Sequence, residues 1–165
     1  IYSAAIKKAA LDPAGIAEMV ASATTLNRIG ADLAKRGDVH AITDVTGFGI
    51  LGHGLEIARG SGLQLRLDMA ALPLLSRAAE LAEAGFFTGA SVRNWAAYGH
   101  EVALPEGLPD WRRHLLTDPQ TSGGLLVAVA PDAAAEVLAQ IRAAGLPLAQ
   151  VIGHCEAGPA GIVVG

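Results

Sequence analysis

The sequence is poor in aromatic residues, in charged residues and in cysteine. Phe, Trp and Tyr make up only 4% of the 165 residues and Asp, Glu, Lys and Arg only 17%, whereas 52% are hydrophobic. This composition excludes a disordered chain and leaves Ala, Leu, Val and Ile to form the core. The one cysteine, Cys155, excludes an intrachain disulfide and favours a reducing compartment, for which we expect the cytoplasm.

The chain also lacks a basic surface and a long apolar run. Its net charge is -4 and its pI is about 5.7, which disfavours nucleic acid as a partner because that needs a basic footprint. No apolar run approaches the roughly 20 residues that span a bilayer, so we expect no membrane partner. The sequence begins at Ile1 in the middle of an apolar pattern, and we expect it to be part of a longer protein.

One glycine-rich stretch, residues 43–54, stands out and is called the first motif (Thr-Asp-Val-Thr-Gly-Phe-Gly-Ile-Leu-Gly-His-Gly). The apolar residues 40–42 before it predict a strand, and the periodic residues 48–59 after it predict a helix. The N-terminus of a helix attracts anions through its unpaired N–H groups and its dipole. Because a carboxylate repels phosphate unless a cation lies between them, Asp44 predicts a Mg²⁺-bridged phosphate site.

Within this motif, Thr46, Gly47 and Gly49 are the candidate phosphate contacts, through backbone N–H groups or the threonine hydroxyl. A purely structural interpretation remains open, in which the glycines only form a turn and Asp44 caps the helix. His53 is either a group that supports the site or a packed neighbour of the turn.

The same glycines fit a rival pattern. Gly47, Gly49 and Gly52 satisfy G-x-G-x-x-G, and a predicted strand over 63–67 is followed by Asp68, as in a dinucleotide-binding unit. Two features disfavour this hypothesis: polar residues crowd the end of the first strand, and Asp44 would repel a pyrophosphate that this fold binds without a metal. A dinucleotide-binding module of an oxidoreductase remains the alternative.

A second turn-rich stretch, residues 118–126, is called the second motif (Asp-Pro-Gln-Thr-Ser-Gly-Gly-Leu-Leu). Thr121, Ser122 and Gly123 are candidates for a backbone nest that binds an anion. A tight turn that leads into the buried strand predicted over 125–130 is an equally good interpretation.

The remaining pattern predicts a layered α/β (α+β) sandwich with one mixed sheet covered by helices. Helices are expected over 13–23, 25–34, 74–84 and 133–144, and strands over 150–154 and 161–164. Periodicity fails between residues 86 and 114, which predicts a long irregular segment of functional or mobile character. Arg93 and Asn94 in that segment are candidates for contact with a nucleotide or another domain.

The two motifs together resemble the signature stretches of the selenophosphate synthetase (selenide, water dikinase) family, in its C-terminal domain. Residues 1–8, 24–27 and 88–99 are also similar to the family, so the resemblance covers nearly the whole chain. The wider superfamily includes aminoimidazole ribonucleotide synthetase, whose C-terminal domain supplies the expected fold.

The resemblance implies an enzyme that makes selenophosphate from selenide, ATP and water, releasing AMP and phosphate, with Mg²⁺ required and a homodimer as the working form. It implies that residues 1–165 are a single C-terminal domain. The ATP-binding N-terminal domain, with the catalytic residues, lies outside this chain, which would contain no catalytic residue of its own. The metal ligand that the motif carries falls on Asp44. A non-catalytic scaffold domain remains a further alternative.

Overall fold

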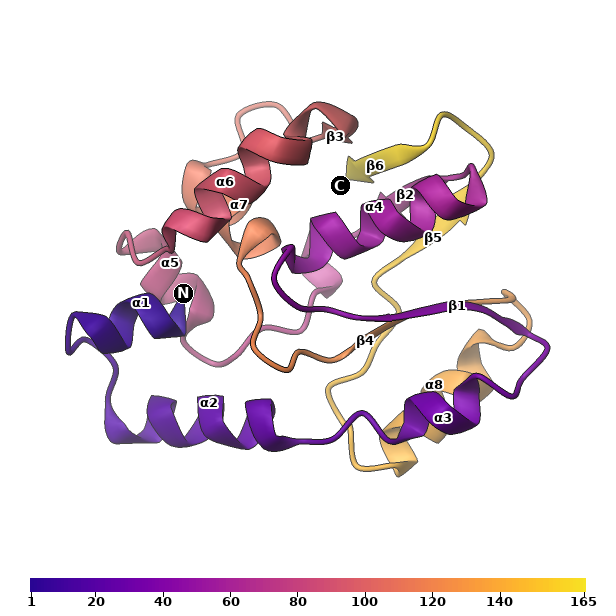
Figure 1. Ribbon diagram of the computed structural model, residues 1–165, viewed down its shortest axis with the longest axis horizontal. Coiled ribbons are helices and arrows are strands. Elements are labelled where there is room, and N and C mark those ends of the chain that lie inside the picture. The colour runs from indigo at the N-terminus through magenta and orange to yellow at the C-terminus, as the bar shows by residue number, and fades with distance from the viewer.

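The computed structural model describes all residues 1–165 as eight α-helices, two short 3-10 helices and six strands (Figure 1). In chain order the elements are α1 (Tyr2–Lys7), α2 (Pro13–Thr24), α3 (Ile29–Leu33), β1 (Val39–Asp44), α4 (Gly49–Ser61), β2 (Gln64–Leu67), η1 (Met69–Ala71), α5 (Ala78–Glu83), α6 (Gly89–Tyr98), η2 (Gly99–Glu101), β3 (Val102–Ala103), α7 (Asp110–Thr117), β4 (Leu125–Val129), α8 (Ala134–Ala143), β5 (Gly153–Glu156) and β6 (Gly161–Val164). None of the helices combines the length and the apolar character needed to span a lipid bilayer.

The strands form two sheets. A four-stranded mixed sheet has the order β3-β6-β2-β5, in which β6 is parallel to β2 and β3 while β5 is antiparallel to β2. The strands β1 and β4 form a separate antiparallel ribbon. The expected mixed sheet is confirmed, but the expectation that it holds every strand is wrong. Both edges of β2 are already paired, which leaves no edge there for β1.

This topology also overturns the dinucleotide-binding alternative. A dinucleotide-binding unit places the strands before and after its glycine-rich helix side by side and parallel in one sheet. Here the strand before α4 is β1 and the strand after it is β2, and they belong to different sheets. Gly47, Gly49 and Gly52 match the glycine pattern without the strand arrangement that gives the pattern its function.

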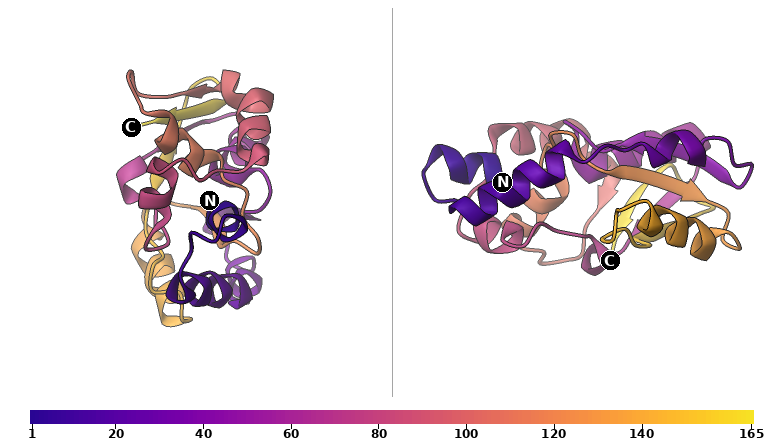
Figure 2. Two further views of the ribbon diagram at one scale, coloured as in Figure 1. Left: turned by 90° about the vertical axis from the view of Figure 1, so that its left-hand side faces the viewer. Right: turned by 90° about the horizontal axis from the view of Figure 1, so that it is seen from below.

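Three hydrophobic clusters hold together the helices and strands whose arrangement Figure 2 shows. Helix α4 packs on the mixed sheet through Leu51 and Leu55, which are fully buried with Ile162 of β6. Helices α3 and α8 cover one face of the ribbon, where Leu33 and Val137 meet. The third cluster joins α1 to α5. All three clusters are aliphatic with few aromatic side chains, as the composition predicts.

The segment 86–114 is not irregular, so that prediction is wrong. It contains α6, α7 and the two-residue strand β3. The side chain of Thr88 caps α6 by accepting a hydrogen bond from the Ser91 N–H. The buried positions of α6 are Ser91, Asn94 and Tyr98, which follow helical spacing but are polar or amphipathic. Hydrophobic periodicity could not reveal a helix whose inward face is largely polar.

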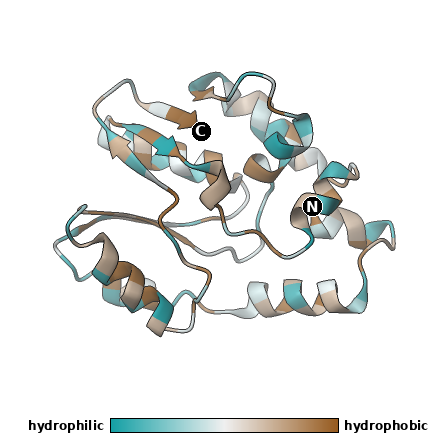
Figure 3. Ribbon diagram, turned by 180° about the vertical axis from the view of Figure 1, so that it is seen from behind, coloured by the Kyte–Doolittle hydropathy of each residue, from teal (hydrophilic) through white to brown (hydrophobic).

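Helix α2 begins at residue 13 as predicted, and the Asp12 carboxylate caps it by accepting a hydrogen bond from the Gly15 N–H. Its apolar side is not a buried face, because Ile16 and Val20 are 39% and 49% exposed. Figure 3 shows α2 along one border of the molecule, apart from the sheets. The helix expected over 25–34 shortens to α3 because Thr25 is extended, and the helix expected from residue 74 begins at Ala78.

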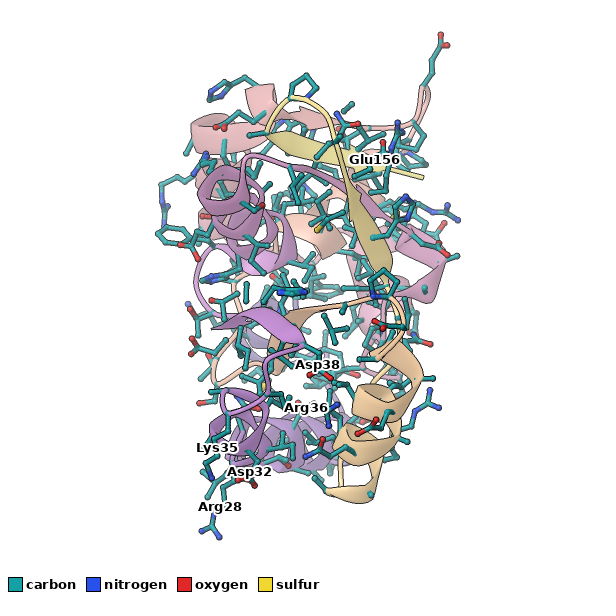
Figure 4. The ribbon with its side chains drawn as sticks, turned by 90° about the vertical axis from the view of Figure 1, so that its right-hand side faces the viewer. Arg28, Asp32, Lys35, Arg36, Asp38 and Glu156 are labelled. Carbon is teal, nitrogen blue, oxygen red and sulfur yellow. The ribbon has the colours of Figure 1, made fainter.

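Charged side chains gather around α3, far from Glu156 on β5 (Figure 4). The Arg36 guanidinium lies 2.7 Å from a carboxylate oxygen of Asp38 and 2.8 Å from one of Glu136, so it links the end of α3 to α8. Its hydrogen bonds hold the pKa of the Asp38 carboxyl below its usual range. This network fastens α8 and α3 over the ribbon that carries Asp44.

Candidate functional site

The two motifs meet at one end of the β1–β4 ribbon. Two turns carry them: the first turn (residues 45–48) joins β1 to α4, and the second turn (residues 118–124) joins α7 to β4. Antiparallel pairing sets Asp44 opposite Leu125, so both turns start from the same end of the ribbon. The Val45 N–H donates to the Gly124 carbonyl at 2.9 Å, and the Gln120 N–H donates to the Thr46 carbonyl at 2.9 Å. The first turn and the second turn are together called the facing turns.

Two glycines allow the turns to approach so closely. A Cβ atom at Gly123 would lie 2.0 Å from the Val45 carbonyl oxygen, which no side chain tolerates. Gly49 has a φ of +68°, and a Cβ there would lie 2.9 Å from the Thr117 carbonyl carbon. By contrast, nothing lies within 4 Å of a Cβ at Gly47 or Gly124. Gly49 and Gly123 are therefore required by packing alone.

The carbonyl groups of Thr46, Gly47, Phe48, Gly123 and Gly124 are bound within the chain, whereas those of Val45 and of residues 119–122 have no partner there. The Thr46 carbonyl accepts from the Gly49 and Gln120 N–H groups, and the Gly124 carbonyl accepts from Val45. Side chains bind the other three bound carbonyls. The Asn94 amide donates to Gly47 at 2.9 Å, the Tyr98 hydroxyl donates to Phe48 at 2.6 Å, and the Asn27 amide donates to Gly123 at 2.8 Å.

The N–H groups of the facing turns are, in contrast, mostly free. Those of residues 46–48 and 121–124 donate to no acceptor in the chain. In a planar trans peptide the N–H points opposite to the carbonyl of the preceding residue. Because the carbonyls of Thr46, Gly47 and Gly123 are turned to partners inside, the N–H groups of Gly47, Phe48 and Gly124 point away from them. A surface of free N–H groups next to a helix N-terminus favours anions.

Asp44 ends β1 beside these N–H groups. It is exposed, and its carboxylate forms no hydrogen bond or ion pair; a weak contact from the Thr43 hydroxyl goes to its backbone oxygen. The capping interpretation is wrong, because α4 begins after Phe48 and has no side-chain cap. No three His, Cys, Asp or Glu side chains cluster to hold a metal ion. A hard oxygen donor of this kind fits Mg²⁺, but as one ligand among several.

Most of the other predicted residues lie beside Asp44 on this surface, whereas Gly49 is buried and its N–H already donates to the Thr46 carbonyl, so its predicted N–H contact with phosphate is wrong. Thr121 and Ser122 are exposed at the tip of the second turn, where Ser122 has a φ of +49°, a conformation typical of backbone nests. Thr46 is half-buried, and its hydroxyl oxygen lies 3.2 Å from Nε2 of His53. The structure thus brings all seven predicted site residues to one place: Asp44, Thr46, Gly47, Gly49, Thr121, Ser122 and Gly123.

Sequence reasoning missed the side chains that fix the turns. Asn94 is buried and donates to both Gly47 and Thr117, so it is an internal clamp and not an exposed contact. Burial raises the pKa of Tyr98 to about 12, which keeps its hydroxyl protonated as the donor to Phe48. The feature of the sequence that could have identified these side chains is the helical spacing of Ser91, Asn94 and Tyr98. Arg93, the other candidate on α6, is exposed.

A second polar cluster, called the buried network, lies close to the second turn. It consists of Ser91, His114 and Thr117, with the Ser91 hydroxyl 2.8 Å from Nδ1 of His114 and 2.7 Å from the Thr117 hydroxyl. The ring of Phe87 stacks on His114 with 3.9 Å between centroids. Burial lowers the pKa of His114, and the Arg113 cation lowers it further. Among buried side-chain polar atoms only Nε of Arg113 lacks a partner.

Comparison with known families assigns this architecture. The model of the family described as "AIR synthase related protein, C-terminal domain" matches residues 3–165. The chain belongs to this family. The AIR synthase-related fold that the two motifs suggested is therefore confirmed.

Two curated relatives of this AIR synthase-related chain share a name. "Selenide, water dikinase" of Rhizobium meliloti (strain 1021) is 63% identical over 164 residues, which cover 99% of the chain and 47% of that relative. The protein of the same name from Pseudomonas straminea is 55% identical over the whole chain and 46% of the relative. These matches confirm the resemblance to the selenophosphate synthetase family. The chain spans about half the length of the curated relatives it matches.

Solved structures share the fold at low sequence identity. Hydrogenase Maturation Protein HypE in complex with ATP superposes with a TM-score of 0.55 at 20% identity, over 85% of this chain and 36% of that one. Thiamine-monophosphate kinase from Stenotrophomonas maltophilia K279a gives a TM-score of 0.51 at 23% identity, over 83% and 34%. Such likeness supports the architecture alone.

Proposed function

We propose that this chain is the C-terminal domain of a selenide, water dikinase, and that its facing turns bind the phosphates of Mg²⁺-ATP. The observation that carries the proposal is the set of free N–H groups at residues 46–48 and 121–124, several of which point outward because the carbonyls of Thr46, Gly47 and Gly123 are bound inside the chain. Relatives named "Selenide, water dikinase" support the reaction. The substrates are then selenide, ATP and water, and the products selenophosphate, AMP and phosphate.

In this proposal Asp44 is one Mg²⁺ ligand. Its carboxylate is exposed and has no partner in the chain, so binding a cation breaks no existing contact. When bound, Mg²⁺ would neutralise phosphate charge, which is the main requirement of phosphoryl transfer. Thr46, Gly47, Gly49, Thr121, Ser122 and Gly123 then shape the surface that faces the phosphates.

The rest of the site comes from elsewhere in the full-length protein. The chain covers 47% of the Rhizobium meliloti relative, and it offers no three-residue metal cluster of its own. We propose that an N-terminal domain supplies the further Mg²⁺ ligands and the catalytic residues, that the enzyme is a homodimer, and that it works in the cytoplasm. The free, exposed Cys155 is compatible with that compartment.

The test uses a full-length chimera in which this chain replaces the matching 164 residues of the Rhizobium meliloti relative. Asp44→Asn should lower Mg²⁺-dependent ATP consumption by about 100-fold, because a neutral amide is a poor Mg²⁺ ligand. Asp132→Asn, which changes another exposed aspartate, is the matched control and should leave the rate unchanged. Equal rates for Asp44→Asn and the parent chimera would contradict the proposal.

A further inference from the structure

The Thr46 hydroxyl ends a chain of three side chains that starts on the outer surface of α4. The Thr46 hydroxyl oxygen lies 3.2 Å from Nε2 of His53, and Nδ1 of His53 lies 2.9 Å from a carboxylate oxygen of Glu56. His53 is 6% exposed, and the Phe48 ring packs at 5.7 Å from its centroid. The three residues, Glu56, His53 and Thr46, are called the Thr46 chain.

Hydrogen-bond chemistry determines which atom donates and which accepts at each contact of the Thr46 chain. An ionised carboxylate only accepts, so the proton of a neutral His53 ring must lie on Nδ1, facing Glu56. Nε2 is then an acceptor, and the Thr46 hydroxyl must donate its one proton to it. What the hydroxyl has left for any other contact is its acceptor lone pairs.

The threonine is fixed at its backbone as well. Its carbonyl accepts from Gly49 of α4 and from Gln120 of the second turn. Side chain and main chain are therefore held by two separate sets of bonds, and the hydroxyl cannot turn to donate elsewhere without breaking the contact with His53. Such fixing by outer partners is typical of groups that must meet a ligand in one orientation.

We propose that Glu56 and His53 are positioning residues that make the Thr46 hydroxyl a hydrogen-bond acceptor for a substrate water beside Asp44. A phosphate oxygen accepts hydrogen bonds and so does not suit this hydroxyl, whereas water donates. The inference rests on the proposed function, whose reaction consumes water. It assigns the phosphates to the free N–H groups and assigns water to Thr46.

Kinetics of the chimera test this assignment. Thr46→Val keeps the shape but removes the acceptor, and His53→Asn removes the partner that orients it. Both should lower kcat by roughly 10-fold to 100-fold with KM for ATP nearly unchanged. Thr46→Ser should restore most of the rate, and the exposed His154→Asn should behave as the parent chimera.

Two results would overturn the inference. An unchanged kcat for Thr46→Val would show that no substrate needs the acceptor, and a raised KM for ATP at unchanged kcat would show that Thr46 binds phosphate instead. Asp44→Asn separates this failure from that of the proposed function. If Asp44→Asn is inactive while Thr46→Val is active, only the role of Thr46 is wrong.

A spectroscopic measurement on the 165-residue chain is independent of activity. In imidazole ¹⁵N NMR the neutral form of the His53 ring should be the tautomer protonated at Nδ1, and Glu56→Gln should reduce that preference. A His53 ring protonated at Nε2 in the unaltered protein would contradict the direction of the hydrogen bonds in the Thr46 chain. It would also contradict the acceptor role of Thr46.

Discussion

Two polar regions lie next to each other in this molecule, and each contains a histidine bonded to a hydroxyl. In the buried network, Ser91 binds both His114 and Thr117, and all three side chains are buried. In the facing turns, Thr46 binds His53, but the surrounding N–H groups and the Asp44 carboxylate have no partners.

The comparison shows that a histidine–hydroxyl pair is not by itself a sign of function. A closed network satisfies its own donors and acceptors and so contributes to stability and to a single packing arrangement. An open one leaves groups that only a ligand or water can satisfy. Changes in the buried network should therefore lower stability, whereas changes at Asp44 should lower activity and leave stability intact.

The largest effect on the free energy of unfolding is expected where the two regions are joined. Gly123→Ala would force a Cβ to within 2.0 Å of the Val45 carbonyl oxygen, so the second turn must move away from the first. We expect a loss of about 3 kcal/mol in the free energy of unfolding, measured by urea denaturation of the chain. Gly124→Ala is the matched control, because its Cβ meets nothing within 4 Å. Equal stability of the two variants would contradict the close contact of the turns.

The second largest effect on the free energy of unfolding is expected for a change in the buried network. Ser91→Ala removes the hydroxyl that binds His114 and Thr117, and it leaves two buried polar atoms without that partner. We expect a loss of about 2 kcal/mol in the free energy of unfolding. In the chimera, Mg²⁺-dependent ATP consumption should stay normal at temperatures where the protein is folded. A specific loss of activity without loss of stability would place Ser91 in the working site instead.

A smaller effect on the free energy of unfolding is expected from the protonation of His114. Burial lowers its pKa from the usual 6.5, so the unfolded chain takes up a proton in a pH range where the folded chain does not. The stability contributed by the neutral ring is present above pH 6.5 and is lost as the pH falls toward the folded pKa. Urea denaturation between pH 8 and about pH 5 should show this decline.

His114→Gln supplies the reference for that pH series. It removes the titrating ring, so its decline in stability over the same range should be shallower than that of the unaltered chain. The exposed His154→Gln should keep the full decline. Parallel pH curves for the unaltered chain and His114→Gln would show that other groups cause the acid sensitivity.

The smallest effect on stability is expected for the residue with the largest role in function. Asp44 is exposed and its carboxylate has no partner, so Asp44→Asn should change the free energy of unfolding by less than about 0.5 kcal/mol. Thermal denaturation of the chain measures this. A clear increase in the free energy of unfolding would agree with relief of strain at a binding site. A clear decrease would mean that Asp44 stabilises the fold and would contradict the contrast between the two regions.

Only the part of this contrast that involves the first motif was predictable from the sequence. The strand, turn and helix around the first motif are as predicted, because the short apolar run, the glycines and the helical periodicity all favour the same structure there. The pairing of β1 with β4 was not predictable, because single strands carry no record of their partners. Nor was α6, whose inward face is Ser91, Asn94 and Tyr98.

The same limit applies to the site. The glycines and Asp44 were identified because each is unusual for its local structure. Asn27 was not identified, and Asn94 was predicted to contact a nucleotide or another domain, because an amide that binds a distant carbonyl looks in sequence like any polar surface residue. The distance between Asn27 and Gly123 along the chain, 96 residues, shows how far outside any local pattern this bond lies.

Hydrogen exchange at the facing turns of the chimera tests the central claim most directly. Peptides covering residues 44–49 and 119–125 should exchange fast in the free enzyme at most of their amides, because the N–H groups of residues 46–48 and 121–124 have no acceptor. A non-hydrolysable ATP analogue with Mg²⁺ should slow both peptides, and omission of Mg²⁺ or the change Asp44→Asn should abolish the protection. Exchange that stays equally fast with the Mg²⁺-bound analogue would contradict the account, because the free N–H groups would then not be the phosphate site.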